Sequence, residues 1–275
     1  MPKDGSIHSA LDRRDLVPIK TTTLLPVKRP AWLRKLRKRF SGTNANRSDM
    51  APQEAWETSI EGEVRFWREY LRTKGERWPG SYDERTDPNL PLQPEIAELI
   101  VAPDGATVKL LDVGAGPLTF VGRTSPQWTL EVTAVDALGA QYGEILDEAG
   151  VVPPVRTQTC ESEQLSTLLQ PDTFDVVTAR NTLDHSYDPA LAIREMLVCA
   201  KPGGAALLIH HRNTGEDEQY HGMHQWNFEA DGHSLIVWRP RTRIDVGESI
   251  KDLGQIERSW VDGAWEGVVI RRAEA

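Results

Sequence analysis

The stretch LLDVGAGPLTFVG, residues 110–122, leads from an apolar strand into a glycine-bearing turn and decides the fold. It continues the apolar run that starts at Thr107. Near-continuous apolar strands are typical of parallel sheets that are covered on both faces. Gly114 and Gly116 allow the backbone to turn sharply and to approach a ligand closely. Because ligands of open α/β sheets bind at the carboxyl ends of strands, the sequence predicts a binding site at this turn.

Strands and helices alternate after the turn. Further strands are expected at TLEVTAVD, VRTQT, FDVVTARN and GGAALLIHH, and helices at GAQYGEILDEAG and DPALAIREMLVCAKPGG. The final stretch, IERSWVDGAWEGVVIRR, reads as two strands joined at Asp262–Gly263, which is a hairpin signal. The pattern predicts an open, mostly parallel α/β sheet that ends in an antiparallel hairpin.

The N-terminal residues differ in charge from the rest of the chain. The net charge is −9, yet residues 1–47 hold 12 Lys and Arg against 3 Asp and Glu. We predict a basic, flexible arm over 1–47, with a short amphipathic segment at 31–40 that could contact a membrane surface or dock on the acidic body. An acidic body repels phosphates, so a nucleic acid partner is not expected.

Residues 48–94 are predicted to form a helical and loop cap before the binding domain. Trp56, Ile60, Val64 and Trp67 recur at helical spacing within a helix expected from Glu54 to Thr73. A long polar loop with aromatic residues follows, and Pro94 starts a short helix. The binding domain is then expected over residues 95–275.

Composition excludes several classes of protein. Cys160 and Cys199 are too few and too isolated for a disulfide framework or a thiolate metal site. The sequence contains no run of about 18 apolar residues, so no membrane span is expected. The N-terminus lacks the apolar core of a signal peptide, and a cytoplasmic location is expected.

The residues around the turn indicate the ligand's chemistry. Thr119 stands where a dinucleotide fingerprint needs a third glycine, and Asp112 would repel a pyrophosphate. Asp136, at the end of the second strand, can accept hydrogen bonds from both ribose hydroxyls. Glu161 can accept one from an exocyclic amine. A nucleoside with a positive, phosphate-free tail fits this set, and S-adenosylmethionine meets that description.

These motifs, in this order, resemble the class I S-adenosylmethionine-dependent methyltransferase family over roughly residues 95–275. The resemblance implies a Rossmann-like three-layer sandwich with a mostly parallel seven-stranded sheet, here with an N-terminal helical extension. It also implies that the cofactor is contacted by Asp112, Gly114, Gly116, Asp136, Ala137, Glu161, Ser162 and Asn181. Arg180 is a further candidate.

The polar stretch NTGEDEQYHGMHQWNF, residues 213–228, follows the fifth strand and is expected to form part of a lid at 213–232 over the acceptor. His185 and His224 are the candidate general bases, with Glu216 as a third catalytic candidate. Aromatic and amide side chains suit a small polar or sugar-like acceptor, so O-methylation is expected. The predicted substrate-binding residues are Trp78, Tyr82, His211, Tyr220, Gln225, Trp226 and Asn227.

Other readings of the same residues stay open. The acidic lid could attract an amine, which would make the protein an N-methyltransferase acting on an amine or a peptide. A non-catalytic subunit that binds S-adenosylmethionine and supports a partner protein is a third reading. His221 and His224 could coordinate a metal, but Gly222 between them disfavours a regular helix. We therefore predict no metal ligand.

Overall fold

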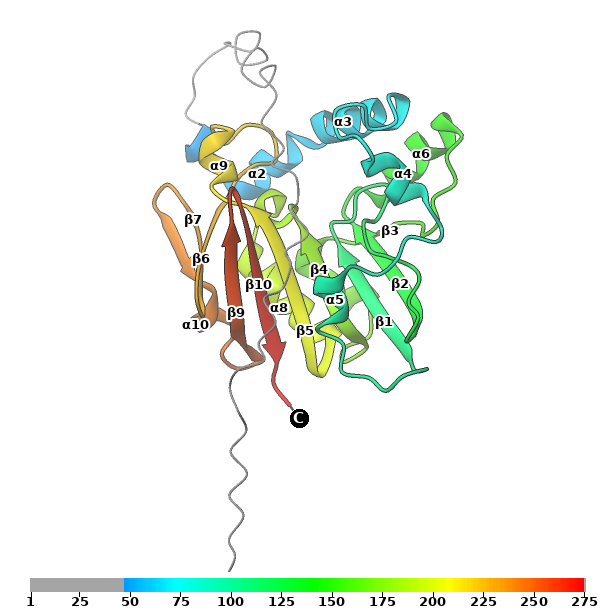
Figure 1. Cartoon of the computed structure of the whole chain (residues 1–275). Helices are drawn as coiled ribbons and strands as arrows, with labels where there is room; N and C mark the ends of the chain where they lie inside the picture. The colour runs from blue at the N-terminus through cyan, green and yellow to red at the C-terminus, as the bar shows by residue number, and fades with distance from the viewer. Residues whose placement is uncertain (1–46, 275) are drawn as a thin grey trace, which may run out of the picture. The chain divides into compact units, whose positions relative to one another are not determined.

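The computed structural model describes residues 47–274, which lie within the compact unit Asn44–Ala275. The predictions for the basic arm, including its segment at 31–40, fall outside the described residues. The main sheet has seven strands in the order β3-β2-β1-β4-β5-β10-β9 (Figure 1). These strands are β1 (Thr107–Val113), β2 (Thr129–Asp136), β3 (Gln158–Thr159), β4 (Phe174–Arg180), β5 (Ala200–His211), β9 (Gly254–Asp262) and β10 (Trp265–Arg272).

Strand β1 lies at the centre of the parallel part of the sheet. It pairs in parallel with β2 on one side and with β4 on the other, so the strand order reverses beside β1. Strand β10 is antiparallel to both β5 and β9. The predicted fold class, a mostly parallel seven-stranded sheet with a C-terminal antiparallel hairpin, is therefore confirmed. The crevice at the carboxyl end of β1 is where such folds bind ligands.

Helices cover the sheet and its carboxyl edge. They are α2 (Pro52–Glu57), α3 (Ile60–Arg72), α4 (Ser81–Thr86), α5 (Pro94–Ala97), α6 (Gly139–Ala149), α7 (Leu165–Leu168), α8 (Pro189–Cys199), α9 (Thr214–Asp217) and α10 (Val246–Ile250). Short 3₁₀ turns occur at Arg47–Asp49, Ser162–Gln164 and Leu183–His185. Within residues 47–274, no helix combines the length and the apolar character that a membrane crossing requires.

The core has three apolar clusters. Two of them pack helices against the sheet, and the third joins two helices. The buried face of α8, with Ile193 and Met196, packs on one side of β4 and β5. Ile96 and Leu99, beside α5, pack on the other side. A third cluster joins α3 to α6 through Tyr142. The sheet is thus the middle of three layers, and α3 extends over its carboxyl edge (Figure 1).

The predicted helix from Glu54 to Thr73 is two helices. It is interrupted at Thr58 and Ser59, whose hydroxyls donate to the carbonyl oxygens of Glu54 and Ala55 at 2.8 and 2.7 Å. Ser and Thr side chains compete in this way with the backbone bonds of a helix. The break places Trp56 in α2 and Trp67 in α3, and it allows the two helices to run in different directions.

A second sheet, absent from the sequence prediction, follows β5. Its strands, in the order β6-β7-β8, are β6 (Asn227–Asp231), β7 (Ser234–Arg239) and β8 (Thr242–Asp245). Residues 227–231 of the predicted lid are therefore a strand. Phe228 anchors the second sheet, since its ring is 1% exposed and stacks on His210 with centroids 4.2 Å apart.

Two further elements differ from the prediction. The loop after Gly75 contains α4, which begins after Gly80 at a φ of 83°. The third strand is only Gln158–Thr159, because Pro153 and Pro154 precede it and proline cannot donate to a strand ladder.

Replacing Phe228 with Ala should lower the free energy of unfolding by about 3–5 kcal/mol, the usual cost of removing a buried phenyl ring. Val152 is 88% exposed, and Val152→Ala, as the control, should change stability by less than about 0.5 kcal/mol. Chemical denaturation measures both. Equal stabilities of the two variants would contradict the packing described for the second sheet.

Candidate functional site

The glycine turn brings the end of β1 into contact with the loop after β4. Gly114 and Gly116 have φ values of +68° and +65°, which L side chains rarely adopt. A Cβ added at Gly114 would lie 1.9 Å from the hydroxyl oxygen of Thr182. The absence of a side chain at 114 is therefore required by the contact between two strand ends as well as by the backbone conformation.

Asp136 lies beside the turn, as its place at the end of β2 predicts. Its carboxylate accepts hydrogen bonds from the N–H groups of Gly116 at 3.1 Å and of Leu138 at 2.9 Å. Burial raises the pKa of Asp136 to about 6, although these two bonds act to lower it. Two carboxylate oxygens can accept about four hydrogen bonds, so Asp136 keeps capacity for a ribose. Ala137, next to it, is half-buried.

Asp112 is 1% exposed and braces the turn from below. It accepts hydrogen bonds from the hydroxyls of Thr119 at 2.6 Å and Thr178 at 3.2 Å. Burial raises its pKa to about 6 against these bonds and the nearby charges of Arg85 and Arg180. The hydrogen bonds of Asp112 are thus made within the protein. Its contact with a cofactor stays a prediction.

The predicted adenine side is held by a hydrogen-bond network after β3. The Glu161 carboxylate accepts from the Tyr187 hydroxyl at 2.8 Å and from Gln164 at 2.6 Å. Ser162 donates to Glu163, which is 6% exposed and was not singled out from the sequence. Glu163 also accepts from the Tyr187 N–H at 2.8 Å, so it joins this loop to the one after β4.

Asn181 stands at the other end of the site with a left-handed φ of 49°. Its side-chain oxygen accepts from the backbone N–H of His211 at 3.2 Å. The guanidinium of its neighbour Arg180 lies 5.1 Å above the Phe120 ring and 6.0 Å from the centre of Trp265. Both residues lie at the carboxyl end of β4, where the resemblance expects a cofactor contact.

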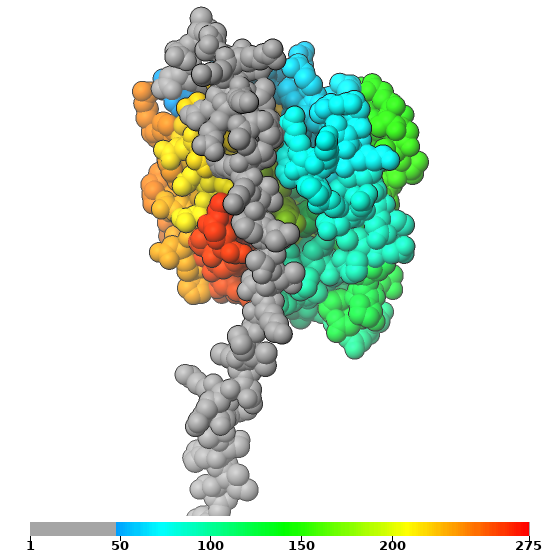
Figure 2. Space-filling model, turned by 45° about the horizontal axis from the view of Figure 1, so that its top comes forward, coloured from blue at the N-terminus to red at the C-terminus, as the bar shows by residue number. Residues whose placement is uncertain are grey.

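Helix α3 supplies a cover over the turn that sequence reasoning missed. A Cβ added at Gly116 would meet the Trp67 ring at 2.8 Å. The Trp67 indole N–H donates to Glu63 at 2.9 Å, and α3 packs on α6, so the cyan and green surfaces adjoin in Figure 2. A ligand that contacts Gly116 on this side would have to displace the Trp67 indole. The helical spacing of Trp67 pointed only to a core position.

A compact cluster of Asp184, His185 and His224 lies after β4. The Asp184 carboxylate is 2.7 Å from Nδ1 of His224, and Nε2 of His185 is 3.0 Å from the same nitrogen. Nε2 of His185 is also 3.6 Å from Asp184. The two predicted bases are thus in contact with each other. Asp184 was not singled out from the sequence, because nothing in its local pattern distinguishes it from Asp188, the N-cap of α8.

Charge favours the ionised form of this cluster. Burial alone would raise the pKa of Asp184, but the charges of His185 and His224 and a hydrogen bond from His224 outweigh it and hold the pKa below its usual range. Burial likewise opposes protonation of His224, and the bond and charge of Asp184 overcome it and raise the pKa of His224. The His224 side chain is 31% exposed, so solvent can reach it.

The cluster and the turn share neighbours. Thr182, which contacts Gly114, is two residues before Asp184. The carboxylate of Glu63 contributes to raising the pKa of both Asp136 and His224, so it lies within electrostatic reach of each. The turn, the α3 cover and the histidine cluster therefore lie close to one another.

Several predicted acceptor residues hold the lid segment together. Gln225, Trp226 and Asn227 are buried. The Trp226 indole donates to the carbonyl of Ser186 at 2.9 Å, and the Asn227 amide donates to the Tyr220 hydroxyl at 3.2 Å. The prediction that they contact an acceptor directly is untested, and the observed role is to position the segment that carries His224.

The remaining predicted residues lie apart from the cluster's contacts. Glu216 is exposed, and its backbone N–H donates to Asn227 at 2.9 Å. Trp78 and Tyr82 pack around Tyr70 with ring centroids 6.1 and 6.2 Å away. The His211 ring meets Trp265 edge-on.

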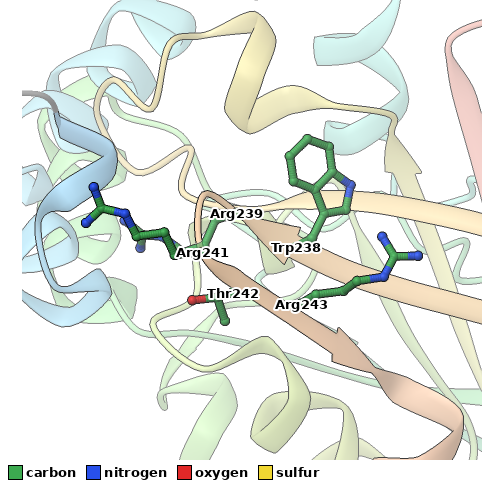
Figure 3. A pocket seen from close by; sticks show the side chains of 5 residues that line it. All are labelled: Trp238, Arg239, Arg241, Thr242 and Arg243. Atoms are coloured by element: carbon green, nitrogen blue, oxygen red, sulfur yellow. The ribbon is translucent and has the colours of Figure 1, made fainter.

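A surface cavity lies on the β7–β8 hairpin, outside the residues predicted for the cofactor. Its lining is Trp238, Arg239, Arg241, Thr242 and Arg243 (Figure 3). Arg239 donates to the carbonyls of Ser48 and Met50 at 2.9 Å. Arg241 pairs with Asp49 and Arg243 with Glu229. These arginines already have partners within the protein, so the cavity is not taken as the functional site.

A family model described as a methyltransferase domain matches residues 30–242, most of the chain. The chain belongs to the methyltransferase domain family. The recognition of a class I S-adenosylmethionine-dependent methyltransferase is thereby confirmed. Among curated proteins, no sequence matches this methyltransferase.

Solved structures with similar chains are remote in sequence. A chain of the complex between the Haloferax volcanii Trm112 methyltransferase activator and its methyltransferase is 11% identical, with 79% of this chain and 99% of that chain covered and a TM-score of 0.49. An S-adenosylmethionine-dependent methyltransferase from Clostridium acetobutylicum is 12% identical, with 76% and 98% covered and a TM-score of 0.44. An O-methyltransferase family protein from Burkholderia thailandensis is 12% identical, with 80% and 60% covered and a TM-score of 0.44. Likeness this remote assigns no substrate.

The pKa of Asp136 gives a pH prediction for cofactor binding. The ionised carboxylate is the stronger acceptor for two hydroxyls, so affinity for S-adenosylhomocysteine should be highest above pH about 7 and fall as the pH drops through about 6. Asp136→Asn should weaken binding at neutral pH by about tenfold or more, which corresponds to one or two lost charge-assisted hydrogen bonds.

Isothermal titration calorimetry across pH 5–8 (about the range over which such a group titrates) measures both effects. Asp104, an exposed residue before β1, provides the control Asp104→Asn, which should bind like the unmodified protein. Unaltered affinity in Asp136→Asn would remove Asp136 from the cofactor site.

Proposed function

We propose that this methyltransferase binds S-adenosylmethionine at the glycine turn and transfers its methyl group to a hydroxyl of a small polar or sugar-like acceptor. In enzyme-class terms this is a methyltransferase of class 2.1.1. The observation that carries the acceptor chemistry is the cluster of Asp184, His185 and His224, which adjoins the turn through Thr182.

The cofactor would be held by residues from three strand ends. Gly114 and Gly116 shape the turn, with Thr182 packed against the first and the Trp67 indole against the second, and Asp136 offers acceptor capacity for the ribose. Glu161, fixed by Tyr187, is the candidate for the adenine amine. Ala137, Ser162 and Asn181 complete the proposed contacts. When bound, the cofactor supplies an electrophilic methyl group on a sulfonium, which neighbouring carboxylates tolerate.

The fit to S-adenosylmethionine depends on the Trp67 indole. This ring occupies the space above Gly116 and lies 6.2 Å from the Tyr142 ring. Arg85 lies 5.8 Å from the Trp67 ring and donates to the carbonyl of Leu118. We propose that α3 opens for the nucleoside and that Arg85 and Arg180 lie near its carboxylate end, since both carry positive charge beside the turn.

The cluster would activate the acceptor hydroxyl. Methyl transfer is an in-line displacement, and a hydroxyl must lose its proton as its oxygen attacks the methyl carbon. Two chemistries suit the cluster. The imidazole of His224, oriented by Asp184, can take the proton, or a cation held by the three side chains can lower the pKa of the hydroxyl. In both, Asp184 is indispensable, because it is the shared anion of the cluster.

The acceptor class is inferred from the surroundings. Among the predicted acceptor contacts, we propose that Tyr220, His211 and Trp78 offer a ring or a hydroxyl to the acceptor. Stacking surfaces with nearby hydrogen-bonding groups suit polyhydroxylated acceptors. Methylation of an amine or a peptide needs no hydroxyl activation, so we rank it second. The acidic charge of residues 48–275 supports the exclusion of nucleic acid.

Replacing Asp184 with Asn or His224 with Gln should lower turnover by about 100-fold or more, the usual contribution of proton transfer. Cofactor affinity should stay within about threefold, because neither residue belongs to the proposed cofactor contacts. The measurement is release of S-adenosylhomocysteine in a screen of sugars, phenols, amines and peptides, with cofactor affinity from calorimetry.

His221 gives the matched control, since it is exposed and close in sequence to His224. His221→Gln should retain full turnover. Full activity of both cluster variants would remove the cluster from the chemistry. Turnover with amines alone would replace the O-methyltransferase proposal by the N-methyltransferase reading, and cofactor binding without any turnover would favour a non-catalytic subunit.

A further inference from the structure

Three potential metal ligands converge on one point at the carboxyl edge of the sheet. Oδ2 of Asp184, Nε2 of His185 and Nδ1 of His224 are separated by 2.7, 3.0 and 3.6 Å. Within the described residues this is the one group of three or more such side chains whose ligand atoms lie within 4.8 Å of one another. The two histidines come from separate segments, the turn after β4 and the lid, so their convergence is a property of the fold.

Hydrogen bonding within the protein satisfies this arrangement poorly. Nδ1 of His224 faces both Asp184 and His185, yet a ring nitrogen carries either one proton or one lone pair. If it accepts from His185, its lone pair faces the carboxylate at 2.7 Å. If it is protonated, its single N–H must be shared between the Asp184 carboxylate and Nε2 of His185, which leaves neither acceptor with a full hydrogen bond.

Buried polar atoms around the cluster also lack partners. Oδ1 of Asp184 has no hydrogen-bond partner, although the Asp184 side chain is only 2% exposed. Both ring nitrogens of His210 are buried without a partner, and this histidine stacks on Phe228. Unpaired buried polar groups cost free energy unless another group compensates them. The unpaired Oδ1 leaves the Asp184 carboxylate able to accept a further bond at the cluster.

We propose that Asp184, His185 and His224 bind a divalent first-row transition-metal ion. Bonds of about 2.1 Å from such an ion place neighbouring ligands about 3.0–3.4 Å apart. The three separations, 2.7, 3.0 and 3.6 Å, lie on either side of this range, so small side-chain shifts would bring the three atoms to it. Two imidazoles and one carboxylate suit zinc, cobalt, nickel or ferrous iron, whereas magnesium prefers oxygen ligands alone. With an ion bound, each of the three atoms would bond to the ion, and the short contacts on His224 would be replaced by these bonds.

The site would leave coordination positions open. Three protein ligands are the number found in catalytic sites, where water or substrate completes the shell. His185 and His224 are 19% and 31% exposed at their side chains, so one side of the cluster is accessible. This assignment replaces the sequence expectation of no metal, which considered only His221 and His224. His221 lies outside the converging group.

The role of the ion rests on the proposed function. An acceptor hydroxyl bound to the ion beside the glycine turn would have a lowered pKa and would release its proton to water. Neither histidine would then be the general base. The ion would also fix the distance between acceptor and turn, because two of its ligands, Asp184 and His185, come two and three residues after Thr182.

The test is a titration of tag-free, chelator-treated protein with Co²⁺, followed by calorimetry and by visible absorption, which reports nitrogen and oxygen coordination. We expect one Co²⁺ per chain and no comparable binding of Mg²⁺. Asp184→Asn, His185→Gln and His224→Gln should each weaken Co²⁺ binding by more than about 100-fold, which exceeds the cost of about 10–100-fold for losing an outer-shell partner. His221→Gln, the matched control, should bind as the unmodified protein does.

The outcomes separate this inference from the proposed function. Absence of Co²⁺ binding, or binding that the three cluster variants leave unchanged, overturns the metal site, and turnover that persists in chelated protein leaves the methyltransferase proposal standing. Co²⁺ binding without methylation of any acceptor supports the site and contradicts the proposed function. Unchanged turnover after metal removal, despite tight binding, overturns the role of the ion in activating the hydroxyl.

Discussion

The contact between Gly114 and Thr182 is the constraint on which the site depends. A hydrogen is all that fits at Gly114, because a Cβ would lie 1.9 Å from the Thr182 hydroxyl. Close-packed protein interiors leave little space for such contacts to change. The turn after β1 and the loop after β4 are thereby held together, and Asp184 and His185 come two and three residues after Thr182. A glycine that the motif assigns to cofactor binding thus also sets the position of the acceptor chemistry.

Helix α3 completes this arrangement from above. Glu63 accepts from the Trp67 indole and lies within electrostatic reach of both Asp136 and His224. Trp67 covers Gly116, and its ring also packs edge-on against Tyr70 with centroids 5.2 Å apart. The hydroxyl-bonded break at Thr58 and Ser59 separates α3 from α2. The proposed opening for the cofactor would involve α3 and its aromatic neighbours.

Local patterns predicted the sheet well and the site in part. The apolar strands, the hairpin at Asp262–Gly263 and the position of Asp136 follow from near-neighbour rules, and the structure has them. The second sheet, 227–245, was missed because its short strands follow a polar stretch that suggested a loop. Asp184 and Trp67 were missed for a different reason: Asp184 meets His224 across 40 residues, and Trp67 meets Gly116 across two elements. No spacing rule connects such pairs, so only the fold reveals the cluster and its conflict over one ring nitrogen.

We propose that the glycine turn and the histidine cluster form one site under α3, and a crystal structure of the protein with S-adenosylhomocysteine would show whether they do. We expect a ribose within hydrogen-bond distance of Asp136, an indole of Trp67 that has left Gly116, and a thioether sulfur on the side of the turn that faces His224. A ligand bound elsewhere, such as at the β7–β8 hairpin, or a sulfur on the side of the turn away from His224, would overturn this proposal.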